Sequence, residues 1–163
     1  MAVTINGSGQ VPVQVIQTVK TDTFTTTSSS FIDVTGLSVT ITPTSASNKI
    51  LVLYSSVMAT LSGQYTCSMR LVRNSTGIYV GDAASTRTRA SNMYWSEASS
   101  VYGSTPVNGI FLDSPATTSA TTYKLQVFTP YSVSIFINRT EIDSDSPYLS
   151  RLPSQITVME IAG

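Results

Sequence analysis

The sequence predicts an all-β protein, an antiparallel β-sandwich of jelly-roll type with about ten short strands. Three observations support this fold class. Most apolar segments are short, and several alternate with polar residues at period two, as strands with one buried face do. Gly, Pro, Asn and Asp interrupt these segments at regular spacing, which is typical of turns. Apolar residues at helical spacing are not sustained over about ten residues, and we expect at most one short helix, over Ala83–Arg89.

The strand pattern continues through most of the chain. The expected strands occupy residues 13–20, 31–42 (in two pieces around Gly36), 49–59, 67–73, 77–82, 107–113, 122–128, 133–138 and 155–162. In the second of these, Leu37, Val39 and Ile41 alternate with hydroxyl side chains and should point into the core. The run 49–59 is apolar at most positions, as a central strand covered on both faces would be.

The segment 111–128 combines a turn with a strand. Asp113-Ser114-Pro115 has turn chemistry, because Pro presets φ and Asp bonds to nearby backbone. After a Ser/Thr-rich loop, Tyr123, Leu125 and Val127 should face inward and the residues between them outward.

Composition excludes several classes of function. Nine basic residues balance nine acidic ones, and charged residues are only 11% of the chain. Such a surface has no field for gathering nucleic acid, and no apolar run reaches the ~18 residues of a membrane span. We therefore expect neither nucleic-acid binding nor membrane insertion. Ser and Thr together number about fifty, while the 41% hydrophobic content argues against disorder.

The sequence does not predict an enzyme. It contains no His and a single cysteine, Cys67, so the common His-dependent nucleophilic and zinc sites cannot be built. Cys67 sits within an expected strand and should be a buried, inert thiol. The acidic residues Glu141, Asp143 and Asp145 alternate, but they lack the Gly and distant Glu of a calcium loop, which favours a solvated turn. We expect no cofactor and no metal.

Two regions depart from the strand pattern. Residues 1–12 carry Gly7, Gly9 and Pro12 and should form an arm or docking segment before a single domain, 13–163. Residues 82–106 lack a clean strand period and hold exposed-type aromatic and Arg residues, which commonly anchor interfaces. These receptor- or interface-contact candidates are Arg87, Arg89, Tyr94, Trp95 and Tyr102. A glycan site and an oligomer interface explain them equally well.

Four strings carry a resemblance that extends from about Val13 to Gly163. They are VQVIQTVKTDTFTTTSSSFIDVTGLSVTITPTSASNKILV, IYVGDAASTRTRAS, FLDSPATTSATTYKLQV and NRTEIDSDSPYLSRLPSQITVMEIAG. With them the chain resembles a family of virion proteins of tailed phages, especially marine and cyanobacterial phages, usually described as tail-fibre-like or structural. The resemblance implies a homotrimeric β-sandwich like the globular heads of tumour necrosis factor and complement. In such trimers the C-terminal strand lies near the threefold axis, which makes Ile156, Val158 and Ile161 trimer-core candidates.

Two roles in the virion follow from this resemblance. The first is a trimeric tail-fibre or receptor-binding head module, whose partners would be other virion proteins, through the N-terminal arm, and a host-surface glycan or protein. The alternative is a capsid decoration (cement) protein that stabilises or ornaments the head. Residue patterns do not separate the two roles.

Overall fold

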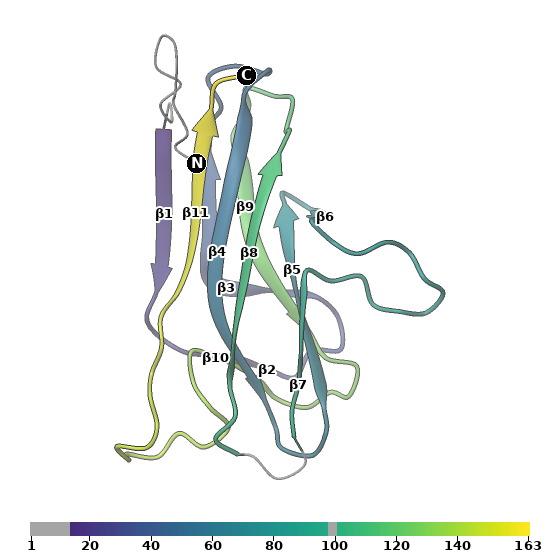
Figure 1. Cartoon of the computed structure of the whole chain (residues 1–163), viewed down its shortest axis with the longest axis vertical. Coiled ribbons are helices and arrows are strands. Elements are labelled where there is room, and N and C mark those ends of the chain that lie inside the picture. Colours follow the sequence, from purple (N-terminus) through teal and green to yellow (C-terminus); the bar gives the residue numbers. More distant parts are fainter. Residues whose placement is uncertain (1–13, 98–100) are drawn as a thin grey trace, which may run out of the picture.

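The computed structural model describes residues 14–97 and 101–163, which form eleven β-strands and no helix (Figure 1). The strands are β1 (Gln14–Lys20), β2 (Phe24–Thr26), β3 (Ile32–Ile41), β4 (Lys49–Thr60), β5 (Thr66–Arg73), β6 (Thr76–Ile78), β7 (Asn92–Trp95), β8 (Thr105–Asp113), β9 (Thr121–Phe128), β10 (Ile135–Ile137) and β11 (Ser154–Ile161). The expected arm over residues 1–12 lies outside the described residues. Within those residues, no helix is long and apolar enough to cross a membrane.

The strands form two antiparallel sheets. Sheet A has the order β1-β11-β4-β10-β2, with β8 paired to the other edge of β4. Sheet B has the order β3-β9-β5-β6, with β7 also paired to β5. Strands β3, β4, β5, β8 and β9 alternate between sheets B and A, and the first and last strands lie side by side in sheet A. This wrapping is that of a jelly roll, so the predicted fold class is confirmed.

The core lies between the sheets and follows the predicted alternation. Leu37, Val39 and Ile41 of β3 are buried, as are Tyr123 and Leu125 of β9. The intervening residues of both strands face solvent to varying degrees. Period-two patterning therefore placed the side chains of these strands correctly, because successive side chains of a strand point to opposite faces.

Three local predictions were wrong. Ala83–Arg89 is a turn-containing excursion between β6 and β7, in which the Arg87 backbone N–H donates to the carbonyl of Ala84 at 3.1 Å. It has no apolar face to pack, so a helix there would lack its main stabilisation. Strand β3 runs unbroken past Gly36, where a φ of +86° accompanies a register irregularity against β9. Residues 82–106, expected to have no clean strand period, contain β7 and the start of β8.

Candidate interaction surfaces

The outer face of sheet A is rich in apolar side chains. One row of paired residues crosses strands β1, β11, β4 and β8 and consists of Val15, Met159, Leu51 and Leu112. Two residues further along β4, Leu53 lies on the same face and pairs with Ile110 of β8. These six residues are called the apolar face below. Their neighbours along each strand are the core residues or pack on the core, so the six side chains point away from sheet B.

The exposure of the apolar face is high for side chains of this type. Ile110 is 65% exposed, Leu112 54% and Val15 53%, while the central Leu51 and Leu53 are partly exposed. The only charged side chain on the same strand face of β4 is Lys49, which bonds to Ser114. In the described part of the protomer these side chains all stay at least partly exposed, although the run in β4 was expected to be buried on both faces.

The outer face of sheet B differs in chemistry. Asp33 accepts from Lys124 Nζ at 2.7 Å and from Gln126 Nε2 at 2.7 Å, and Arg70 Nε donates to Gln126 Oε1 at 2.9 Å. Arg70 also lies over the ring of Phe31, 3.9 Å from its centroid. This part of the outer face of sheet B is thus a hydrogen-bonded polar surface, while Met93 and Trp95 of β7, on the same face, are 65% and 51% exposed.

The five predicted contact residues lie at three separate places. Arg87 and Arg89 line a cavity of about 520 Å³ beside Met93. Tyr94 packs against the core, whereas Trp95, the next residue of β7, points to the other face and is 51% exposed. Tyr102 lines a different cavity, together with Tyr148 and Leu149. The five residues therefore do not form one cluster, because the alternation of β7 turns Tyr94 away from Trp95 and Tyr102 lines another cavity.

The trimer-core candidates also divide. Ile156 and Val158 are fully buried between the sheets within one protomer, so their side chains are not available to a second copy. Ile161 points to the opposite face of β11, as Met159 does, and is partly exposed. The apolar side chains of the last strand that remain partly exposed are thus Met159 and Ile161.

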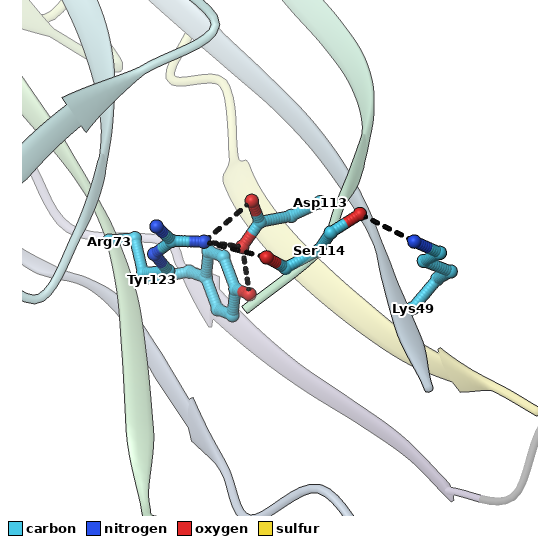
Figure 2. A network of polar contacts seen from close by, with 5 residues as sticks. All are labelled: Lys49, Arg73, Asp113, Ser114 and Tyr123. Carbon is cyan, nitrogen blue, oxygen red and sulfur yellow. Dashed lines mark hydrogen bonds and ion pairs between the residues drawn. The ribbon is translucent and has the colours of Figure 1, made fainter. Parts of the chain in front are cut away.

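Buried polar groups form closed networks. The carboxylate of Asp113 accepts two contacts of 2.8 Å from Arg73 Nη1 and one of 2.6 Å from the Tyr123 hydroxyl (Figure 2). Lys49 joins the edge of this network through Ser114. Burial and the adjacent carboxylate raise the pKa of Tyr123. These contacts connect β8 of sheet A with β5 and β9 of sheet B, so the network has a structural role.

Glu160 is the second buried carboxylate. Its oxygens accept from Gln14 Nε2 at 2.6 Å, from the backbone and hydroxyl of Thr44 at 2.6 and 2.8 Å, and from Asn48 Nδ2 at 2.6 Å. Burial by itself would raise its pKa, but these four donors outweigh it and hold the pKa of Glu160 at about 2. Among the described residues, no buried side-chain nitrogen or oxygen lacks a partner.

Neither Cys67 nor the acidic segment 141–145 has the geometry of a reactive site. Cys67 is fully buried, and burial raises the pKa of its thiol to about 12. Glu141 accepts from the backbone N–H of Ser62 at 2.6 Å, and Asp143 pairs with Arg151 at 2.7 Å. In the part of the chain that the structure describes, no three acidic, Cys or His side chains converge as metal ligands.

Two further cavities lie at the end of the sandwich where β11 begins. They are formed by the segment between β10 and β11, together with Tyr102. Residue patterns gave no indication of Tyr148 or Arg151, which line them, because both lie in the irregular segment between β10 and β11, which has no period. The sequence feature that could have indicated this site is Tyr148, an aromatic residue at the end of the polar string DSDSPY.

Comparison with known proteins gives fold-level likenesses only. No protein-family model matches the sequence, and no curated protein sequence matches it. Among solved structures, the chain is similar to that of the infectious bursal disease virus Gx strain, with 13% identity, a TM-score of 0.40 and 99% of this chain covered. It is also similar to the VP2 subviral particle of infectious bursal disease virus, with 9% identity, a TM-score of 0.32 and 100% covered. The chain spans 42% of the length of each of these two proteins.

Proposed function

We propose that the protein is a non-enzymatic structural component of a phage virion, and that it forms a homotrimeric tail-fibre or receptor-binding head. The observation that carries this proposal is the apolar face of sheet A. An exposed apolar surface several strands wide is unusual on a monomer and marks an interaction site. A virion module built from repeated copies of one chain requires such a surface.

The occupant that we propose for this face is a second copy of the same chain. The face is bordered by few charges, and the whole chain has a formal net charge of zero, so identical copies do not repel one another. Trimer symmetry is taken from the resemblance to phage virion proteins. Met159 and Ile161 of β11 lie on the outer side of the sheet, which agrees with a last strand near the symmetry axis.

Several features support a structural over a catalytic role. The chain contains no His. Its two buried carboxylates, Asp113 and Glu160, are engaged by fixed donors within the protomer, which leaves them poorly placed for acid–base chemistry. The N-terminal arm would dock the trimer onto other virion proteins, and the end of the sandwich where β11 begins, opposite the start of β1, would face outward.

Sedimentation velocity tests the assembly. The wild-type chain should sediment as a trimer, and Ile110→Glu combined with Leu112→Glu should sediment as a folded monomer. Both side chains are more than half exposed, so the protomer fold should survive, as far-UV circular dichroism can check. Ser38→Glu, on the outer face of sheet B, is the matched control and should leave the trimer intact. A wild-type chain that stays monomeric at high concentration would contradict the proposal.

The position in the virion needs a second measurement. Immunogold labelling of intact particles should place the protein at the tail for a fibre module. Label over the capsid would instead identify a decoration protein. The same apolar face would then serve trimer formation, and the end of the sandwich where β11 begins would have no ligand.

A further inference from the structure

The segment between β10 and β11 encloses two adjoining cavities that the assembly role does not use. Their volumes are about 360 and 480 Å³, and they share Ser144, Ser146 and Leu149 in their linings. They lie where β11 begins, at the opposite end of the sandwich from the start of β1, because β1 and β11 pair antiparallel from Gln14–Glu160 to Lys20–Ser154 (Figure 1).

One cavity has an aromatic rim. Tyr102 and Tyr148 both line it, and Ile142 and Leu149 contribute the apolar part of its wall. Tyr148 is 90% exposed and Tyr102 64% exposed, so two tyrosine rings are accessible to a ligand. An aromatic ring with a hydroxyl offers a flat apolar surface and a polar edge, which suits ligands that have both C–H and O–H groups.

The adjoining cavity has a polar wall with unused hydrogen-bonding capacity. Arg151 Nη2 contacts Asp143 Oδ2 at 2.7 Å, and Arg139 Nη1 approaches the same oxygen at 3.6 Å. Among the described residues, no donor is placed on Asp143 Oδ1, and Arg151 retains further N–H groups. A held carboxylate with a free acceptor beside free guanidinium donors can bind adjacent hydroxyl groups of one ligand.

We propose that these two cavities form one binding site for a neutral saccharide, with a sugar ring packed on Tyr148, the more exposed of the two tyrosines, and its hydroxyls bonded to Asp143 and Arg151. The proposal rests on the proposed function, since it specifies the host-surface ligand of the receptor-binding module. The lining favours a neutral sugar over an acidic one, because it holds Asp143 and Asp145 against one Arg. An acidic ligand would be better matched by the cavity beside Arg87 and Arg89.

Saturation-transfer difference NMR on the full chain tests the site. The probes are the neutral oligosaccharides maltotriose, cellotriose, lactose and N,N′-diacetylchitobiose, with 3′-sialyllactose as the acidic comparison. At least one neutral probe should receive saturation. Tyr148→Ala and Asp143→Asn should each weaken its binding about tenfold or more, which corresponds to about 1.4 kcal/mol. Tyr131→Ala, another half-exposed tyrosine, is the matched control and should leave binding unchanged.

The possible results separate this inference from the assembly proposal. If no neutral probe binds, or if Tyr148→Ala and Tyr131→Ala behave alike, the saccharide site is refuted. Binding of 3′-sialyllactose alone would also refute it and would point to the Arg87 and Arg89 cavity. Sedimentation of the same samples reports the trimer independently, so a monomer that binds a neutral sugar refutes only the assembly.

Discussion

Replacing Glu160 by Gln should destabilise the protein strongly at neutral pH and much less in acid. The side chain is fully buried and accepts four hydrogen bonds from Gln14, Thr44 and Asn48. In the Gln variant the amide oxygen can keep the three donors on Oε1, but the amide nitrogen replaces Oε2 and faces the donor of Gln14. One charge-assisted bond is lost and the remaining three become neutral.

The size of the effect follows from the strengths of these bonds. A hydrogen bond to a charged group contributes roughly 1.5–3 kcal/mol, and a neutral one roughly 0.5–1.5 kcal/mol. The losses overlap because three donors share one oxygen, so we expect the free energy of unfolding to fall by about 3 kcal/mol at pH 7. Glu97→Gln, an exposed control, should change it by less than about 0.5 kcal/mol.

The pH dependence supplies the sharper test. The folded pKa of Glu160, about 2, lies below its ordinary value of 4.5. Its contribution is therefore complete above pH 4.5 and is lost as the pH falls toward 2, where the folded state must also take up the proton. Urea unfolding followed by circular dichroism, at one fixed protein concentration, should show the difference between wild type and variant shrinking over that window. An equal difference at pH 7 and at about pH 2.5 would refute the reasoning.

Three further changes have defined outcomes. Tyr123→Phe removes the hydroxyl that donates to the carboxylate in Figure 2 and should cost about 1.5 kcal/mol in urea unfolding. Gly109→Ala places a methyl group against the ring of Tyr54, so it should lower the free energy of unfolding by about 1–3 kcal/mol and lower the melting temperature. Gly81→Ala is the control, because a methyl group there meets open space, and it should leave the melting temperature unchanged. Cys67 should react with a thiol reagent only in urea, because it is buried and its pKa is raised; fast labelling of the folded protein would contradict its position.

Period-two patterning predicted which residues form the core, but it could not show what covers the other side of a strand. In β4, Ile50 and Val52 face sheet B and are fully buried, as expected of a central strand. Leu51 and Leu53 also belong to the apolar run, yet in the described part of the protomer they remain partly exposed on the outer face of the sheet. An apolar residue in the sequence indicates that its side chain is buried in the functional protein. The pattern is the same whether the side chain is buried within its own chain or against a neighbouring chain.

The candidate site was less predictable for two physical reasons. Tyr94 and Trp95 are adjacent in sequence, but the alternation of β7 places them on opposite faces. Tyr148 and Arg151 lie in the irregular segment between β10 and β11, where conformation depends on local hydrogen bonds and no period reveals which side chains converge. Contacts between Tyr102 and the β10–β11 segment depend on tertiary packing, so no spacing in the sequence could have predicted them.

The proposed trimer would strengthen attachment through the proposed saccharide site. The apolar face runs along the strands of sheet A, whereas the cavities lie at one end of the same sheet, so trimer formation leaves them open. Three copies related by symmetry would present three such sites at the same end. Single saccharide sites of this kind bind weakly, but linked sites bind a surface with an avidity that can exceed each affinity by roughly 10²–10⁴. Disrupting the apolar face with Ile110→Glu and Leu112→Glu should therefore abolish attachment to a sugar-coated surface while leaving the affinity for a soluble sugar unchanged.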